Sequence, residues 1–505
     1  MRRISKEVRK LKTVDELALS IDDASDAGEE QLLRELGEEC EQRLLTAEGE
    51  ERVRLRYFQA NTYSGIVAVK RKDPKYAWNW DQPESVQGIL ALRRAICEPA
   101  FEKVHHILAC QIRTNLASSL SWLGRPISAN ELRLKVLETE PRLAKTLAGR
   151  AKEVTYLAGA VYDEGHRDCL LSAAQSMYEA ALLDNAVWES DDRKCVAPSL
   201  SQGLEKISCY LDAVGYDRSL DLSQWPLGLS GEERNYRLWS LQNRLFLNPL
   251  NEAYTVSVAA TDVLHLPSHV YRIDEAPRFP AYYNLLKQEY ISARYRLYHA
   301  TCEEDPEFLM RDVGLLNSGE NQIFGHYTED LRSAFRSAYS ILDKIGLFLN
   351  DYYDIGLKPR NVTFRNIWYS KQRSDHREIR PKFRNSRNWL LRGLFFLSKD
   401  LFDETFMEVA EPDAADLAKL RNQVEHRFLG FHLYEEGKND ETHRLVPLGE
   451  FQDKTLRMLK LAREALIYLS LAMHREEDIR EEKSRSSAEL RSTFKPRPID
   501  DIKRL

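Results

Sequence analysis

The sequence predicts an all-α protein. Glycine and proline, which interrupt helices, number only 22 and 18 among 505 residues. Apolar side chains recur every three to four residues through most of the chain, which is the spacing of a buried helix face. Only residues 254–259 have a fair strand pattern, and one strand cannot build a sheet. We therefore expect helical repeats near the N-terminus, a helical middle region and a C-terminal bundle of four or five helices.

The composition excludes several classes of protein. A hydrophobic share of 43% and nearly balanced charges, 73 Lys+Arg against 79 Asp+Glu, are typical of a globular protein. No apolar run approaches the roughly 18 residues that cross a bilayer, and no secretory signal is visible. The seven cysteines contain no CxxC pair, which argues against disulfides and zinc ribbons. We expect a cytoplasmic protein that needs neither metal nor cofactor.

The pattern divides the chain into five parts. These are an N-terminal extension, a repeat region, a middle region, a helical bundle and a charged tail, at residues 1–28, 29–199, 200–328, 329–478 and 479–505. The middle region is rich in leucine and aromatic residues, which is typical of a core rather than of an active site.

The repeat region contains two similar segments. Residues 115–125 align with residues 156–166, and each segment is followed by a second helical pattern. Ala117 and Ala158 would let paired helices approach closely, while Gly124 would permit the turn between them. The pattern resembles tetratricopeptide repeats, which stack helix pairs around a concave binding face. The alternative is an ordinary helical domain without a groove.

A clean amphipathic helix is predicted from Glu329 onward. Its apolar positions step by three or four residues and form one seam: Phe335, Ala338, Leu342, Ile345, Leu349 and Tyr352. A polar stripe recurs every seven residues beside it, at Arg336, Asp343 and Asn350. Further helices are expected at about 386–408, 413–433 and 450–478.

The segment 358–392 is strongly basic. It holds eleven basic residues against two acidic ones, with aromatic residues between them. Cations suit phosphates and flat rings suit bases, so this composition predicts contact with single-stranded nucleic acid. The candidates for RNA binding are Arg365, Lys371, Arg373, Arg377, Arg380, Lys382, Arg384, Trp368 and Trp389. The alternative is a solvated helical surface whose aromatic residues face the core.

A candidate catalytic pair lies in the expected helix 413–433. Arg421 and His426 are five residues apart, so on a helix their side chains diverge by about 140° and can border one cleft. Imidazole can act as base or acid in RNA cleavage, and a guanidinium can hold the phosphate as charge builds up. One histidine cannot easily fill both roles, so we expect two copies of this helix to meet in a homodimer.

Two other Arg-x4-His pairs are present in the chain. They are Arg294 with His299 and Arg427 with His432. In both pairs an aromatic residue directly follows the arginine, and such a residue favours packing over phosphate chemistry. Only Arg421 is followed by a polar residue, Asn422.

The motif Arg421-Asn422-x-x-Glu425-His426, late in a helical bundle, resembles the signature of the HEPN superfamily. The helix around Asp343 and residues 364–368 are similar to one branch of it, in which tetratricopeptide-like helices precede a C-terminal HEPN domain. The resemblance implies a metal-independent, dimeric endoribonuclease, often found in toxin or anti-phage defence systems. It implies an active-site motif and a candidate polar support: Arg421, Asn422 and His426, supported by Glu425, Asp343, Lys344 and Asn350.

Three classes of function remain open. The first is a ribonuclease effector whose N-terminal helices bind a protein or phage-derived trigger or restrain the nuclease. The second is an HEPN/tetratricopeptide-like scaffold that binds RNA or protein without cleaving. The third is a repeat scaffold with no nucleic-acid role, which leaves the Arg421–His426 motif and the basic segment unexplained.

Overall fold

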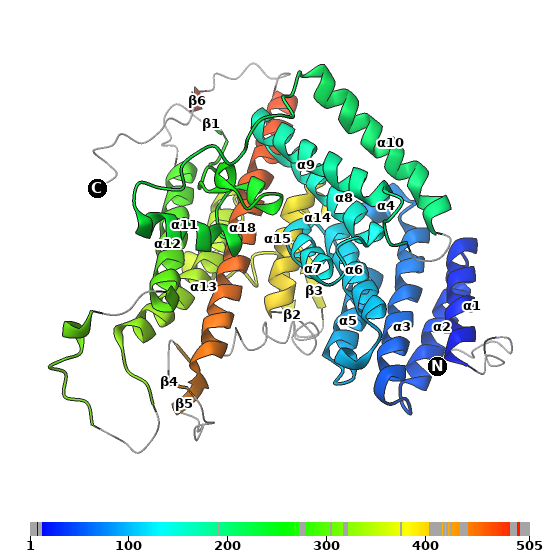
Figure 1. The fold of residues 1–505 in the computed structure, drawn as a ribbon, viewed down its shortest axis with the longest axis horizontal. Helices are drawn as coiled ribbons and strands as arrows, with labels where there is room; N and C mark the ends of the chain where they lie inside the picture. Colours follow the sequence, from blue (N-terminus) through cyan, green and yellow to red (C-terminus); the bar gives the residue numbers. More distant parts are fainter. Residues whose placement is uncertain are drawn as a thin grey trace. The chain divides into compact units, whose positions relative to one another are not determined.

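The computed structural model describes residues 8, 13–188, 192–267, 269–271, 278–302, 306–316, 322–373, 376–402, 417, 420, 423–424, 427–433, 443–484 and 492–494. These residues are mainly helical and carry only three two-stranded sheets, which confirms the predicted all-α class (Figure 1). None of the helices in these ranges is both long and apolar enough to cross a membrane.

The chain forms two compact units. Unit 1 comprises residues 1–159, 165–218 and 377–414, and unit 2 comprises residues 160–164, 219–376 and 415–505. The boundary that follows residue 376 falls inside the basic segment and inside the bundle expected at 329–478. The expected domain limits stay a prediction. The contacts of helix 389–402 nevertheless group it with the N-terminal helices in unit 1, and the sequence did not indicate this grouping.

Unit 1 is built from helices. They are α1 (Val14–Ala27), α2 (Glu30–Arg43), α3 (Gly49–Lys70), α4 (Pro74–Ala77), α5 (Pro83–Cys97), η2 (Phe101–Lys103), α6 (His106–Trp122), α7 (Pro126–Thr139), α8 (Ala144–Ala160), α9 (Glu164–Leu182), α10 (Asp192–Ala213), α14 (Pro381–Arg384) and α15 (Trp389–Phe402). Local signals set their ends. At α1, Thr13 and Glu16 each bond the other's backbone N–H in a capping box, and Gly28 ends the helix with φ +72°.

Within unit 1, α6 packs against α7, and these helices correspond to the first copy of the predicted repeat. Figure 1 shows α1, α2, α3, α5, α6 and α7 in a row, and consecutive helices of this series pack against each other. Ala117 and Ala158 are both fully buried. Gly124 turns the chain between α6 and α7 with φ +92°, and a Cβ there would lie 2.2 Å from the carbonyl oxygen of Trp389. The contact of α6 with α7 fits the first copy of the repeat, while the second copy and the assignment to tetratricopeptide repeats stay a prediction.

A buried ion pair fixes α15 to the rest of unit 1. The carboxylate of Asp400 accepts two hydrogen bonds from Arg93 of α5, at 2.8 and 2.9 Å, and pairs with Arg125 next to α7. All three side chains are at least nine-tenths buried. The contact explains why α15 clusters with helices that precede it by hundreds of residues.

Unit 2 combines helices with short strands. Its elements are α11 (Gly231–Gln242), η3 (Pro249–Glu252), η4 (Ser257–Ala259), β1 (His269–Tyr271), α12 (Arg278–Cys302), η5 (Glu307–Leu309), α13 (His326–Tyr352), η6 (Pro359–Asn361), β2 (Tyr369–Arg373), β4 (Phe428–His432), β5 (His443–Pro447), α18 (Leu448–Ser484) and β6 (Ser492–Phe494). Strand β1 pairs with β6, and β4 runs parallel to β5. Strand β2 pairs with β3 (His376–Ile379).

The core of unit 2 lies between α12, α13 and α18, which pack against one another (Figure 1). The predicted seam of α13 is confirmed, since Phe335, Ala338, Leu342, Ile345 and Leu349 are fully buried and Tyr352 is 6% exposed. The helix starts three residues earlier than expected, at His326.

Two predicted elements are wrong. Residues 254–259 form no strand, because Ser257–Ala259 is a 3₁₀ turn whose Val258 N–H donates to the carbonyl of Leu222. The helix expected at 413–433 does not continue to its end, because residues 428–432 form β4. This strand pairs in parallel with β5, and the side chain of Leu445 lies over Gly430, where a Cβ would be 2.5 Å from it.

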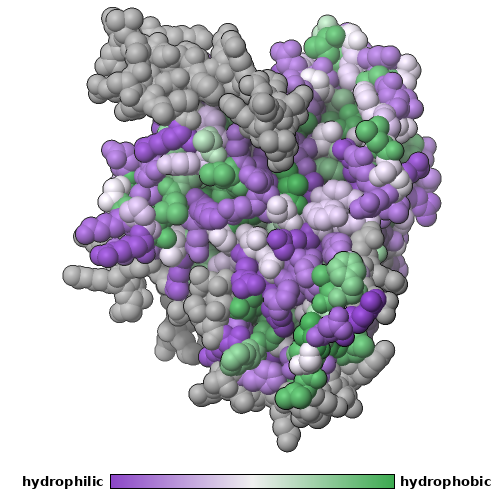
Figure 2. All heavy atoms as spheres, turned by 90° about the vertical axis from the view of Figure 1, so that its left-hand side faces the viewer, coloured by the Kyte–Doolittle hydropathy of each residue, from purple (hydrophilic) through white to green (hydrophobic). Residues whose placement is uncertain are grey.

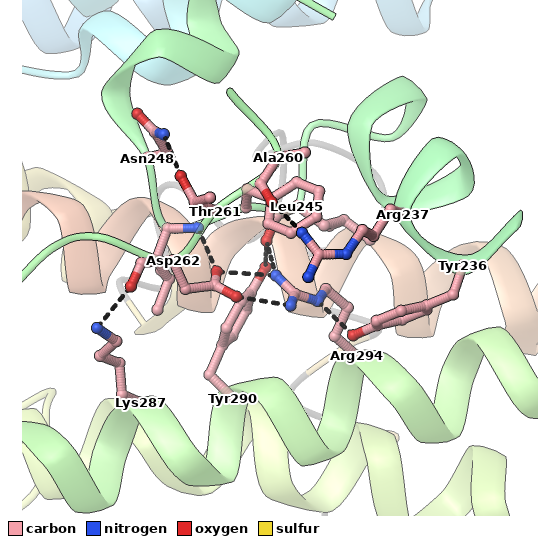
Figure 3. A network of polar contacts seen from close by, with 12 residues as sticks. Tyr236, Arg237, Leu245, Asn248, Ala260, Thr261, Asp262, Lys287, Tyr290 and Arg294 are labelled. Carbon is pink, nitrogen blue, oxygen red and sulfur yellow. Dashed lines mark hydrogen bonds and ion pairs between the residues drawn. The ribbon is translucent and has the colours of Figure 1, made fainter. Parts of the chain in front are cut away.

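Two buried arginines hold the irregular segment 245–264 within unit 2. Arg294 of α12 forms a two-point contact with Asp262, at 2.9 and 2.7 Å, and also donates to the carbonyl of Leu245 (Figure 3). Arg463 of α18 donates to the carbonyl of Phe246 at 2.7 Å and pairs with the carboxylate of Glu252. Arg294 is therefore engaged in structural contacts within unit 2.

The surface is mixed in polarity. On the face drawn in Figure 2, hydrophilic side chains predominate and hydrophobic ones are scattered among them. A few large apolar side chains are strongly exposed, among them Leu229, Leu316 and Phe428. Exposed apolar side chains are common on protein surfaces, so they indicate no particular partner.

Candidate functional site

The predicted catalytic motif lies outside the residues that the structure describes. This applies to Arg421, Asn422, Glu425 and His426, so their arrangement stays a prediction. Four residues between Leu417 and Val424 are described. Leu417, Leu420 and Val424 are buried in unit 2, and the side-chain oxygen of Gln423 accepts a hydrogen bond from Arg444 of β5 at 3.1 Å. The segment that carries the motif is thus held to unit 2 at several points.

Strand β4 begins two residues after His426 and is also well anchored. Its residue Phe431 accepts a hydrogen bond at its carbonyl from the N–H of Ile323 at 2.8 Å. Arg332 of α13 donates to the carbonyl of Leu429 and lies over the ring of Phe431. The start of α13 and the residues before it therefore contact the strand that follows the motif.

The three candidate supporting residues on α13 are engaged in structural contacts. Asp343 accepts a hydrogen bond from the N–H of Phe364 at 3.1 Å. Asn350 is 5% exposed and bonds both the N–H and the carbonyl of Leu357. Lys344 pairs with Glu289 of α12 at 2.5 Å. These contacts connect the segment 355–364 and α12 to α13, while support of a catalytic site stays a prediction.

Among the described side chains of the basic segment in unit 2, Lys358 and Arg360 are exposed cations. Arg365 is half-buried. The side chains of Lys371, Arg373 and Arg377 lie outside the described part of the structure. Their role in RNA binding stays a prediction.

The unit 1 part of the segment offers exposed cations at Lys382, Arg384 and Arg387. The carboxylate of Glu378 lies 3.9 Å from Arg384, which compensates little of this charge. Partial burial lowers the pKa of Arg380. Unit 1 therefore presents basic side chains along residues 382–387.

The expected stacking role of Trp368 is wrong. This side chain is fully buried, and its ring N–H donates to the carbonyl of Phe364 at 2.8 Å. Its rings thus have no free face for a base. Trp389 is half-buried and donates to the carbonyl of Ser121, with its ring edge-on to Tyr156. Base stacking on Trp389 stays a prediction.

One cation of the basic segment is a core residue. Arg392 is 3% exposed and donates to the carbonyls of Ala77 and Trp122, at 2.8 and 2.6 Å. Burial lowers its pKa to about 10. The net charge of the segment therefore overstates the charge that it offers to a partner.

One cluster escaped the sequence analysis. His299, His326 and Asp330 bring three potential metal-ligand atoms within 4.8 Å of one another. His326 and Asp330 are four residues apart, and this spacing places two side chains on the same face of a helix. The sequence therefore contained a signal for two of the three members. His299 lies on a different helix, so nothing in its local sequence indicated the third member.

Comparisons with known proteins identify the C-terminal region. Residues 270–476 match the family model described as LA2681-like HEPN. The chain therefore carries a C-terminal HEPN domain of the LA2681-like type, and the resemblance of the Arg421–His426 region to this superfamily is confirmed at the level of the family. No curated protein and no solved structure matches the chain.

Proposed function

We propose that the chain is a metal-independent endoribonuclease. The observation that carries the proposal is the motif Arg421-Asn422-x3-His426 inside the region matched as an HEPN domain. A polar residue directly after the arginine and a histidine five positions away supply the charge and the proton-transfer group that cleavage needs.

The proposed chemistry uses the RNA itself as nucleophile. The 2′-hydroxyl attacks the adjacent phosphorus and the bond to the 5′-oxygen breaks, leaving a 2′,3′-cyclic phosphate and a 5′-hydroxyl. One His426 takes the proton of the 2′-hydroxyl, and a second, from the partner copy, protonates the leaving oxygen. Arg421 holds the phosphate oxygens with its planar fork, and Asn422 orients them. This division of roles makes a homodimer the active form.

Two features of the described structure support the proposal. Leu417, Leu420 and Val424, which neighbour the motif in the sequence, are buried in unit 2. Exposed cations at Lys382 and Arg384 in unit 1 and at Lys358 in unit 2 provide attraction for an RNA backbone. The N-terminal helices are proposed to bind the trigger of a cytoplasmic defence or toxin system.

The test compares cleavage by the intact chain with cleavage by His426→Ala. Purified protein is incubated with total RNA, and the ends of the products are sequenced. His106→Ala, which removes an exposed histidine of unit 1, serves as the matched control. Activity that is lost only in His426→Ala supports the proposal. Binding of RNA by the intact chain without any cleavage would place it among the silent HEPN scaffolds.

A further inference from the structure

The cluster of His299, His326 and Asp330 joins two helix ends in unit 2. His299 lies three residues before the end of α12, His326 is the first residue of α13, and Asp330 follows one turn later. Asp330 is 8% exposed, His299 is 24% exposed and His326 is 48% exposed. The cluster is thus buried at its carboxylate and open to solvent at one imidazole.

The distances fit a metal ion of zinc size. Oδ2 of Asp330 lies 3.2 Å from Nδ1 of His299 and 3.5 Å from Nδ1 of His326. Ligands on a tetrahedral zinc are about 3.3–3.4 Å apart, since each bond measures about 2.0–2.1 Å. The ring centroids of the two histidines are 6.4 Å apart and nearly perpendicular. Two of the three ligand–ligand distances therefore already match a tetrahedral ion, and all the ligand atoms lie within 4.8 Å of one another.

One ring nitrogen of the cluster is buried beside the carboxylate of Asp330. Nδ1 of His299 is buried and makes no hydrogen bond of acceptable geometry, although it faces Oδ2 of Asp330. The other carboxylate oxygen, Oδ1, accepts a hydrogen bond from Arg296 at 2.9 Å. Such a contact fixes a carboxylate in the orientation in which its second oxygen can bind a metal.

We propose that His299, His326 and Asp330 bind one divalent transition-metal ion of the zinc class, with water in the fourth position. Two imidazoles and one carboxylate are a common ligand set for such ions, whereas Mg²⁺ and Ca²⁺ prefer oxygen ligands. The site is independent of the proposed cleavage chemistry, because none of its members belongs to the Arg421–His426 motif.

The ion would act as a clip between α12 and α13. It closes the chain segment between residues 299 and 326, so binding energy adds to the stability of unit 2. It also fixes the start of α13, where Ile323 and Arg332 contact the carbonyls of Phe431 and Leu429. Metal binding thus stabilises the strand that follows the motif.

The test measures metal binding and unfolding rather than RNA cleavage. The untagged full chain, stripped with a chelator and dialysed, is titrated with Zn²⁺ by calorimetry and with Co²⁺ by visible absorption. We expect one ion per chain, the d–d bands of tetrahedral Co²⁺, and a Tm that rises when Zn²⁺ is added.

Variants assign the ligands. His326→Ala removes a half-exposed side chain, so the fold is kept while the affinity for Zn²⁺ falls at least about tenfold. Asp330→Asn and His299→Ala should lose the Co²⁺ bands, and Arg296→Ala should weaken binding by about 10–100-fold. The double variant His105→Ala/His106→Ala removes the adjacent histidines of unit 1 and should bind Zn²⁺ as the intact chain does.

Either of two results would overturn the proposal. One is the absence of stoichiometric binding and of any change in Tm when Zn²⁺ is added to the intact chain. The other is a folded His326→Ala variant that binds Zn²⁺ with unchanged affinity. Since no RNA enters the experiment, its failure is distinct from a failure of the proposed nuclease.

Discussion

Arg294 and Asp262 form a buried two-point ion pair that joins α12 to the segment before it (Figure 3). The family match begins at residue 270, yet this pair makes residue 262 part of the same packed unit. Water hardly competes for the hydrogen bonds of the Arg294 guanidinium, because the side chain is only 2% exposed. The structural unit that contains the HEPN domain is therefore larger than the matched region.

Asp262→Asn is expected to destabilise unit 2 strongly. The change leaves the charge of Arg294 buried without a counter-charge, and loss of one partner of a buried pair typically costs about 3–5 kcal/mol. The measurement is the midpoint of urea unfolding by circular dichroism. Asp221→Asn, at an exposed carboxylate of the same unit, should leave the midpoint unchanged. An equal loss in both variants would contradict the assigned role of the pair.

The contribution of the Arg294–Asp262 pair to the stability of unit 2 should vanish in acid. Burial raises the pKa of Asp262, but the charge and hydrogen bonds of Arg294 and the N–H of Leu247 outweigh burial and leave the pKa below its usual value. The folded state thus favours the carboxylate. The stabilisation is full above the unfolded pKa of about 3.9 and is lost as the pH falls through the lower folded value.

The midpoint difference between the intact chain and Asp262→Asn should accordingly be constant from pH 7 to pH 5 and shrink below pH 4. Urea titrations across this range measure it. A difference that stays constant down to pH 2 would show that the pair acts by shape rather than by charge.

Asp400→Asn is expected to loosen α15 within unit 1. The substitution leaves Arg93 and Arg125 buried without their common carboxylate, with a typical cost of about 3–5 kcal/mol. Hydrogen exchange of peptides from residues 389–402 should accelerate, because α15 loses its main polar contact. Asp184→Asn, at an exposed ion pair with Arg193, is the control and should exchange as the intact chain does. Unchanged exchange in Asp400→Asn would mean that apolar packing alone holds α15.

The helical parts of the fold could be predicted because their signals are local. The apolar seam from Phe335 to Leu349 and the small side chains at Ala117 and Ala158 give the buried faces directly. Strand β4 could not be predicted in this way. It pairs with β5 and, at Phe431, with Ile323, and these partners lie outside the strand's own local sequence.

For the candidate site, too, the sequence showed the residue types but not the contacts that depend on folding. The basic composition of residues 358–392 is visible in sequence, but burial is not. Trp368 and Arg392 have the right residue types for RNA and are both core residues. The cluster around Asp330 was missed for the opposite reason, since α12 supplies His299 only once the two helices pack side by side.

Removing four cations of the basic segment should weaken RNA binding. The variant Arg373→Ala/Arg377→Ala/Arg380→Ala/Arg384→Ala releases fewer counterions, so the slope of log K against log salt should flatten by about 0.7 for each lost phosphate contact. Fluorescence anisotropy with a single-stranded RNA from 50 to 300 mM salt measures this slope.

The control for that variant removes exposed cations elsewhere in unit 1. The substitutions are Arg193→Ala, Lys194→Ala, Lys206→Ala and Arg218→Ala. Binding that falls equally in both variants would indicate only the loss of overall positive charge. Unchanged binding and salt slope in the first variant would make the segment a solvated or structural surface.

Cleavage of RNA should depend on the Arg421–His426 motif. His426→Ala removes the proton-transfer group from both copies of a symmetric site, and general acid–base catalysis typically contributes about 10²–10⁴-fold. Arg421→Ala should cost a similar factor. Arg421→Lys should restore little, because a point charge cannot replace a planar fork. Asn422→Ala should have a smaller effect, since a neutral amide orients the phosphate without reacting.

The ends of the products and the response to chelation test the reaction itself. We expect 2′,3′-cyclic phosphate and 5′-hydroxyl ends, which resist direct adaptor ligation. We also expect the active fraction to be a dimer, as measured by light scattering.

Cleavage should persist in EDTA at a temperature where circular dichroism shows the chelated chain to be folded. This condition matters because the ion held by Asp330 stabilises unit 2 without entering the chemistry. Loss of cleavage in folded, chelated protein, or 5′-phosphate ends, would instead require a metal-activated water and a different site. Full activity of a strictly monomeric species would exclude the symmetric arrangement of two histidines.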